Sequence, residues 1–258
     1  MRFDGKAVFV TGGGSGIGEA TCYAFAVEGA LVAVADVNVD GAEKVAAEIR
    51  GAGGKALAIE LDVSDSTSVE EAFGKAEGWY GETTSVLVNS AGIVGINAFL
   101  DYSLKQWEQV LAVNVTGAFL CAQRAAKSMV RARSGRIVNV GSVSGVRAGI
   151  GRTGYGTSKA AILGLTKQIA MELGPYGVTA NAIAPGPVLT PLTATSYTPD
   201  TIDSYTSMIP ARRLGTVDEM SDAILFIASE HAGYINGVLL PVDGGYLAGG
   251  VNRTGKLG

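Results

Sequence analysis

The sequence predicts an α/β fold in which one doubly wound parallel sheet of about seven strands carries helices on both faces. Wholly apolar, β-rich runs such as residues 7–10 and 31–35 are typical of strands that are buried on both faces. Amphipathic stretches of helical length alternate with these runs, which indicates βαβ units. The 258 residues are 47% hydrophobic and show no repeat or linker, so we expect a single domain over residues 1–258.

The hydrophobic pattern predicts each element in order along the chain. Apolar runs bounded by turn-forming residues predict strands at residues 7–10, 31–35, 56–61, 85–88, 136–140, 178–184 and 238–242. Helical spacing of apolar residues predicts helices at residues 19–28, 41–50, 104–129 and 217–229, and one that begins near Tyr155. Residues 191–210 are rich in Thr, Ser, Tyr and Pro and show little periodicity. For that region we expect a mobile substrate lid, at about residues 189–210, or a disordered insert.

Residues 11–18 read TGGGSGIG and join the first strand to the first helix. A dinucleotide site requires this order of strand, glycine loop and helix. The glycines permit a tight turn and let the backbone approach a pyrophosphate at the helix N-terminus. A lone glycine pattern also fits an ordinary turn, but here both flanking elements are present. The candidate cofactor-binding residues of this loop are Gly12, Ser15, Gly16, Ile17 and Gly18.

Asp36 directly follows the second predicted strand. An acidic side chain at this position can accept hydrogen bonds from an adenosine ribose. The alternative is a turn aspartate that starts the next helix, although Asn38 and Asp40 can also cap that helix. Ligands on parallel sheets bind at the carboxyl ends of the strands, so Asp36, Asp62 and Asn89 are expected along one edge.

Tyr155 and Lys159 stand one turn apart at the start of a predicted helix, so their side chains share a face. A free tyrosine has a pKa near ~10, and a nearby cation lowers it by favouring the phenolate. Such a pair can act as a general acid/base, whereas the commoner occurrence at this spacing is a solvated polar pair. Ser142 follows the fifth predicted strand. Asn114 falls within the predicted helix 104–129, where asparagine is mildly unfavourable, so it is either satisfied in the core or functional.

Composition and charge exclude several classes of function. A net charge of -4 and a pI near 5.1, without a basic stripe, argue against nucleic acid as a partner. No apolar run reaches the ~18 residues of a membrane span, and we expect no signal peptide, so the predicted location is cytoplasmic. Cys22 and Cys121 lie in apolar helical patterns and are expected to be buried, reduced thiols. Because His231 is the single histidine, we expect no His-based metal site.

Several motifs occur together in a set order, and through them the sequence resembles the short-chain dehydrogenase/reductase family, in its NAD-dependent type. The resemblance runs from about residue 3 to residue 247 and implies a Rossmann-type sheet. The motifs are TGxxxGxG at residues 11–18, Asp62-Val63, NxAG at residues 89–92, Asn114, Ser142, Tyr155-x-x-x-Lys159, and Pro185-Gly186 with Thr190. Two departures are Ser90, where the family often has a second Asn, and Ser85, where an acidic residue is common.

The resemblance implies roles for these residues. Tyr155 would be the general acid/base, and Lys159 would lower its pKa and hold the nicotinamide ribose. Ser142 would bind the substrate oxygen, and Asn114 would hold a water in the proton path. The residues implied to contact the cofactor are Gly12, Ser15, Gly16, Ile17, Gly18, Asp36, Val37, Asp62, Val63, Asn89, Ala91, Gly92, Tyr155, Lys159, Pro185, Gly186, Val188 and Thr190.

The implied function is an NAD(H)-dependent oxidoreductase that interconverts a secondary alcohol and a ketone by hydride transfer. One alternative is a 3-oxoacyl-carrier-protein reductase. Those relatives tend to carry a basic docking residue where this chain has Tyr176, although Arg133 keeps a second basic position. Asp36 also disfavours the NADPH that many of them use. A remote alternative is a non-catalytic nucleotide-binding protein on the same fold, but such proteins usually lose the tyrosine or the lysine.

By the same resemblance, the substrate pocket lies between residues 93–99, residues 143–154 and the lid. Apolar side chains line these stretches, together with the hydroxyls of Thr193, Thr195, Ser196 and Tyr197. Such a lining favours a neutral secondary alcohol or ketone. The basic residues there are Arg147 and Arg152, and Arg152 stands three residues before Tyr155. An anionic hydroxy substrate is therefore the alternative, although a solvated loop arginine is the commoner case.

The expected partners are few. The resemblance implies a small-molecule substrate, and from charge, hydropathy and the single histidine we expect no nucleic acid, no membrane and no metal. Relatives pair the helices that correspond to residues 104–129 and 156–173, usually in tetramers, so we expect a homotetramer.

Overall fold

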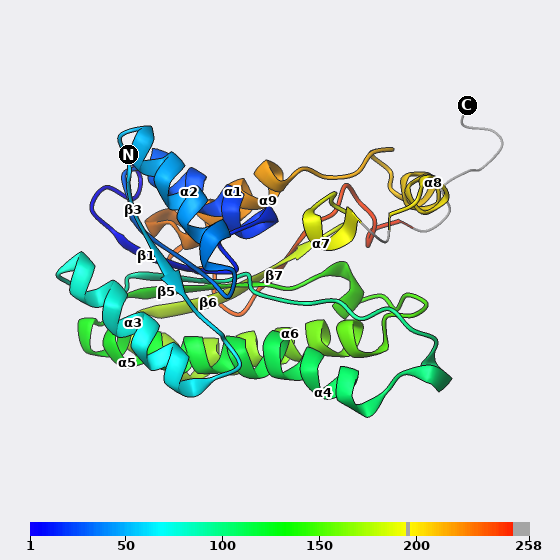
Figure 1. Cartoon of the computed structure of the whole chain (residues 1–258), viewed down its shortest axis with the longest axis horizontal. Helices are drawn as coiled ribbons and strands as arrows, with labels where there is room; N and C mark the ends of the chain where they lie inside the picture. The colour runs from blue at the N-terminus through cyan, green and yellow to red at the C-terminus, as the bar shows by residue number, and fades with distance from the viewer. Residues whose placement is uncertain (195–196, 250–258) are drawn as a thin grey trace.

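The computed structural model describes residues 1–194 and 197–249. Within those residues, one parallel sheet has seven strands in the order β3-β2-β1-β4-β5-β6-β7 (Figure 1). The strands are β1 (Ala7–Thr11), β2 (Leu31–Asp36), β3 (Lys55–Glu60), β4 (Val86–Asn89), β5 (Gly135–Val140), β6 (Val178–Pro185) and β7 (Leu239–Val242). The predicted fold class is confirmed, and each strand lies within about one residue of its predicted bounds.

Helices cover both faces of the sheet (Figure 1). One face carries α1 (Gly16–Val27), α2 (Val39–Gly51) and α9 (Val217–Ala228). The other carries α3 (Ser66–Tyr80), α4 (Leu104–Leu111), α5 (Ala118–Ala132) and α6 (Thr153–Leu173). The connections between strands, most of them helical, bring the chain back to the same end of the sheet, so neighbouring strands pair in parallel.

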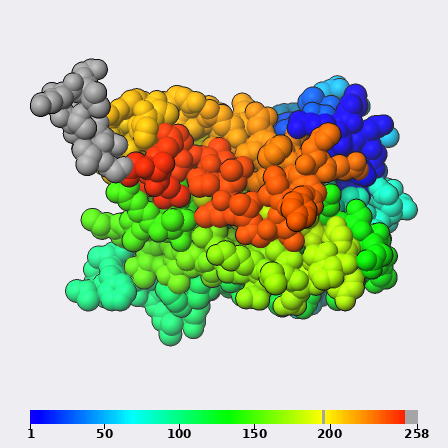
Figure 2. Space-filling view, turned by 180° about the vertical axis from the view of Figure 1, so that it is seen from behind, coloured from blue at the N-terminus to red at the C-terminus, as the bar shows by residue number. Residues whose placement is uncertain are grey.

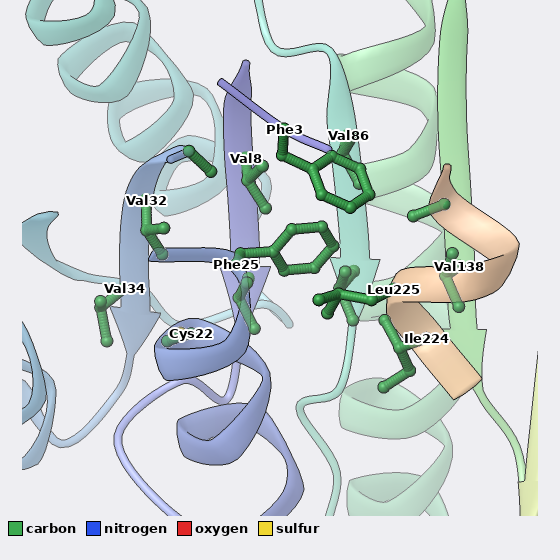
Figure 3. Close-up of a cluster of buried hydrophobic side chains, with 14 of the residues drawn as sticks. Phe3, Val8, Cys22, Phe25, Val32, Val34, Val86, Val138, Ile224 and Leu225 are labelled. Atoms are coloured by element: carbon green, nitrogen blue, oxygen red, sulfur yellow. The ribbon is translucent and has the colours of Figure 1, made fainter. Parts of the chain in front are cut away.

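Alternate residues of each strand pack into two separate cores. Val8 of β1 points into the first core, which also contains Phe25 of α1 and Ile224 of α9 (Figure 3). Its neighbour Phe9 points to the opposite face and stacks on Phe73 of α3, with ring centroids 4.1 Å apart. Burial on both faces explains why the strands are wholly apolar rather than alternating, at a gain of about 1.5–3 kcal/mol for each large side chain.

The strand order reverses between β1 and β4, which are neighbours in the sheet. The connections after these two strands run to opposite sides, so a crevice opens at their carboxyl ends. The glycine loop follows β1 and residues 89–92 follow β4, and the two segments meet there. A side chain at Gly12 would place its Cβ 2.8 Å from the backbone of Ala91, so only glycine permits this approach.

The helix predicted at residues 104–129 is helical throughout but changes its turn in the middle. A π-helical segment, η2 (Ala112–Gly117), separates α4 from α5, and α5 ends at Ala132. The segment lies against the end of β3, where a Cβ on Gly117 would come 2.6 Å from Val63. Its wider turn contains Asn114, and π-helical turns are often found at functional sites.

Residues 191–210 contain more regular structure than their sequence suggested. They form α7 (Pro191–Ala194) and α8 (Pro199–Met208). The signal for α8 is Thr198, whose side chain accepts from the backbone of Thr201, followed by Pro199 in the first helical turn. The segment after β7, red in Figure 2, lies beside the yellow α8. Thr195 and Ser196, predicted to line the pocket, lie outside the described residues.

Candidate active site

A cavity of about 800 Å³ opens at the carboxyl ends of the strands, in the crevice between β1 and β4. Its walls come from the glycine loop, the ends of β2 to β6, the start of α6, and α7 and α8. Asp36 and Asp62 line it beyond β2 and β3, and Tyr155 lines it at the start of α6. This is the position at which doubly wound sheets bind ligands.

Tyr155 and Lys159 project from the first turns of α6 and both line the cavity, as their spacing predicted. The Lys159 Nζ lies 5.7 Å from the centroid of the Tyr155 ring. It donates a hydrogen bond of 2.7 Å to the carbonyl of Val140, at the end of β5. Ser142 lies just beyond that strand, and its hydroxyl also lines the cavity. The three side chains therefore meet at one wall.

Burial is the main influence on the pKa values of Tyr155 and Lys159. Burial raises the pKa of Tyr155, while a hydrogen bond with Ser142 and the charge of Arg152 act in the opposite direction. Lys159 is not among the groups that shift this pKa, so its predicted role in lowering the pKa of Tyr155 stays a prediction. Its ammonium is tied to Val140 and lies over the ring, and burial lowers the pKa of Lys159 itself to about 8.

Because Lys159 is buried, we expect the free energy of unfolding to change with pH in the alkaline range. The unfolded chain holds this proton up to pH 10.5 and the folded chain only to about pH 8, so the unfolding free energy rises with pH across this window. At about 1.4 kcal/mol per pKa unit the rise is about 3 kcal/mol. Urea unfolding at several pH values would show this component in wild type and not in Lys159→Met. Lys167→Met, at an exposed position of α6, is the control, and equal pH slopes in wild type and Lys159→Met would refute the assignment.

Asn114 lies behind the cavity wall and is buried. Its Oδ1 accepts from the backbone of Ile93 at 2.8 Å, and its Nδ2 donates to the Ile93 carbonyl at 3.0 Å. The same Nδ2 donates to Ser158 Oγ at 2.9 Å. The amide thus ties the segment after β4 to α6, next to Lys159.

The glycine loop and Asp36 hold each other in place. Asp36 Oδ2 accepts from the backbone of Gly14 at 3.0 Å, and Oδ1 accepts from Asn38 at 2.9 Å. Gly16 has a φ of +58°, which favours glycine, and lines the cavity. Gly18 packs against the back of the loop. A Cβ at this position would come 2.0 Å from the Gly12 carbonyl oxygen, so a larger residue would not fit.

Most of the predicted site residues line the cavity, and three do not. Those that do are Gly12, Ser15, Gly16, Ile17, Asp36, Val37, Asp62, Val63, Ala91, Gly92, Ser142, Tyr155, Lys159, Pro185, Gly186, Val188 and Thr190. Gly18, Asn89 and Asn114 lie outside the lining. Asn89 ends β4 at the expected edge, but its side chain turns into the core and donates to Asn139 Oδ1 on β5 at 2.9 Å.

Sequence reasoning missed Tyr246 and Gln109, which also line the cavity. Tyr246 follows β7 and packs edge-on against Tyr205 of α8, with ring centroids 6.4 Å apart. Tyr205 in turn contacts Tyr197, at 5.4 Å between centroids. No local motif marks Tyr246, since only the return of the chain after β7 brings it to the site.

The residues present fit a nicotinamide dinucleotide. Glycines at positions 12 and 16 leave the backbone open toward the N-terminus of α1, where a pyrophosphate is stabilised. Asp36 offers acceptors at the β2 end, and the ammonium of Lys159 stands at the far end. When bound, such a group supplies or accepts a hydride. Among the described residues, no cluster of metal-ligating side chains occurs, and no helix is both long and apolar enough to cross a membrane.

Comparisons with known proteins agree over nearly the whole chain. A family model described as enoyl-(acyl carrier protein) reductase matches residues 12–247. The chain is 41% identical to 2,5-dichloro-2,5-cyclohexadiene-1,4-diol dehydrogenase of Sphingobium indicum, over 96% of this chain and 98% of the relative. It is 38% identical to a 3-oxoacyl-[acyl-carrier-protein] reductase of Aquifex aeolicus, over 95% and 98%. The solved structure of levodione reductase superposes with a TM-score of 0.93 at 32% identity, covering 96% of this chain and 100% of that one.

Proposed function

Because the chain belongs to the short-chain dehydrogenase/reductase family and is an oxidoreductase, we propose that it uses NAD(H) to interconvert a secondary alcohol and a ketone. The observation that carries this proposal is the meeting of Tyr155, Ser142 and Lys159 at one cavity wall. The relatives point the same way, since their names describe dehydrogenation of a diol and reduction of oxo groups.

Tyr155 is the general acid/base of the proposed reaction. In the oxidation direction, the phenolate oxygen of Tyr155 would accept the proton of the substrate hydroxyl, and a bound NAD⁺ would supply the hydride acceptor. Ser142 donates to the same substrate oxygen and fixes its position. Lys159, held by Val140, presents its ammonium below the ring, where the positive charge favours the phenolate once a ligand excludes water.

The other predicted residues hold the cofactor or the site. Gly12, Ser15, Gly16 and Ile17 form the pyrophosphate cradle, and Gly18 shapes that loop from behind. Val37, Asp62 and Val63 line the cavity where they would flank the adenine, and the residues that would hold the nicotinamide half are Ala91, Gly92, Pro185, Gly186, Val188 and Thr190. Asn89 supports the site indirectly, because its hydrogen bond to Asn139 fixes the end of β4. For Asn114 we propose that its bonds to Ile93 and Ser158 support a water in the proton path.

NADH absorbance during incubation with secondary alcohols and NAD⁺, or with ketones and NADH, tests the proposal. Polyols, diols, hydroxysteroids and hydroxy acids form the panel, each tried with NAD and NADP. Turnover that stays unchanged in Tyr155→Phe would refute the role of Tyr155. Binding of NADH with no turnover of any panel member would favour the non-catalytic alternative.

A second candidate, reduction of a carrier-bound 3-oxoacyl group, is favoured by the Aquifex aeolicus relative. The surface at the predicted docking site is less suited to binding an acidic acyl carrier. Tyr176 stands exposed at one of the two basic positions, and the guanidinium of Arg133 donates to the Pro175 carbonyl at 3.1 Å. Assays with an acyl-carrier thioester and with its free thioester analogue distinguish the two functions.

We also propose a cytoplasmic homotetramer. Cys22 and Cys121 are free and buried, which suits a reducing compartment. Apolar side chains stand exposed on α4, α5 and α6, at Leu104, Phe119 and Met171. Light scattering at micromolar concentration is expected to give four times the 26.3 kDa of the chain, and Phe119→Glu with Met171→Glu to give a smaller particle. A monomeric mass for wild type would contradict the prediction.

A further inference from the structure

Two arginines line the end of the cavity at which the reacting residues stand. The Arg152 guanidinium carbon lies 5.7 Å from the centroid of the Tyr155 ring. The Arg147 guanidinium carbon lies 5.1 Å from the centroid of the Tyr246 ring. Each cation therefore rests over a tyrosine face, and a guanidinium in that position keeps its N–H edge free for another group.

Neither guanidinium has an acidic partner within the described residues. The arginines found in ion pairs there are Arg2, Arg50, Arg124 and Arg213, each with a glutamate. The carboxylates that line the cavity, Asp36 and Asp62, stand at the opposite end, beyond β2 and β3. The reacting end of the cavity thus carries positive charge that the described part of the chain does not balance.

The Arg152 charge reaches the reacting group. Burial raises the pKa of both Tyr155 and Tyr197, and in each case the charge of Arg152 acts in the opposite direction. Arg152 is half-buried and its guanidinium lies over the Tyr155 ring, so it is directed toward this phenol rather than away into solvent. This position differs from the solvated loop arginine that is common at such sequence positions.

Resting on the proposed function, we propose that the substrate is a hydroxy acid, in equilibrium with its oxo acid, whose carboxylate is bound by Arg152 with support from Arg147. A planar guanidinium matches a carboxylate with two parallel hydrogen bonds. Tyr197, Tyr205 and Tyr246 then contact the body of the substrate between the carboxylate and the reacting carbon. The carboxylate takes no part in the redox step. This proposal replaces the neutral substrate that the sequence favoured.

Matched substrate pairs test the charge directly. We would measure kcat and KM for 2-, 3- and 4-hydroxy acids with NAD⁺, each beside its primary amide, which has a similar shape and no charge. For at least one pair, wild type is expected to show a KM lower by about 10- to 100-fold for the acid, as for a hydrogen-bonded charge. Arg152→Ala should raise the KM of the acid by that factor and leave the KM of the amide unchanged. Arg152→Lys should restore part of the loss, and Arg131→Ala, at an exposed position of α5, should change nothing.

KM values for the amides that are equal to or lower than those for the acids, in every pair, would overturn the proposal. Turnover of neutral alcohols alone would also overturn it.

A binding assay separates this inference from the proposed function. Thermal unfolding with NADH is expected to show a higher Tm with benzoate than with benzamide, and Arg152→Ala to abolish the difference. That result without turnover of any panel member would refute the proposed function alone, whereas turnover without the difference would refute the carboxylate site alone.

Discussion

Tyr155→Phe is expected to lower kcat by at least about 10²–10⁴-fold, the factor usually supplied by general acid/base catalysis. The substitution removes one hydroxyl from a ring that is held by its position in α6, so the cavity keeps its shape. The Lys159 bond to Val140 does not depend on the hydroxyl, so we expect the Kd for NADH to change little.

Single-turnover kinetics and NADH fluorescence measure the two quantities separately. Tyr234→Phe makes the same chemical change at a fully exposed position and is the control for loss of a hydroxyl elsewhere. Near-normal turnover of Tyr155→Phe would exclude Tyr155 as the proton donor. A parallel loss of NADH binding would instead indicate that the substitution disturbs the fold of the site.

The second large effect concerns the choice between NAD and NADP. Asp36 would face a 2′-phosphate with a like charge, which at ~4 Å and an effective dielectric near 20 costs about 4 kcal/mol. Screening at this half-exposed edge reduces the cost, and we expect kcat/KM to favour NAD by about 10²-fold, or about 2.7 kcal/mol. Val37 and Asn38 follow Asp36, so the next two residues supply no arginine to bind the phosphate.

Asp36→Asn separates charge from structure, because the amide oxygen can still accept from Gly14. This variant is expected to lose most of the discrimination while keeping its Tm within a few degrees. Asp62→Asn, at the neighbouring carboxylate, is the control and should change the ratio much less. Equal or better kcat/KM with NADP in wild type would refute the assignment of Asp36.

Local patterns in the sequence were enough to predict much of the site. Tyr155 and Lys159 come together because one helical turn separates them, and Asp36 lies at its edge because a buried strand ends there. The same reasoning could not foresee that Asn89 turns inward. Its side chain is drawn to Asn139 on β5, which faces it in the register of two strands fifty residues apart.

Other features depend on contacts that no local pattern contains. Asn114, in the π-helical turn, is held by hydrogen bonds with Ile93 and Ser158. Tyr246 reaches the cavity because the chain returns to it after β7. The pKa of Tyr155 depends on how deeply the ring is buried, and this burial cannot be predicted from its one-turn spacing to Lys159. Sequence therefore predicts which side chains an element presents, whereas their partners follow from how elements pack.

The pairing of β1 with β4 at the centre of the sheet also has a kinetic consequence. The hydroxyl of Tyr80 donates to the Val8 carbonyl 72 residues away, whereas β2 and β3 join through a single helix. Closing a long loop loses more chain entropy than closing a short one, so distant pairings slow folding. The crevice opens where this distant pair diverges, and Tyr246, after β7, completes its wall. On refolding, the recovery of NADH binding should therefore follow the recovery of helical signal.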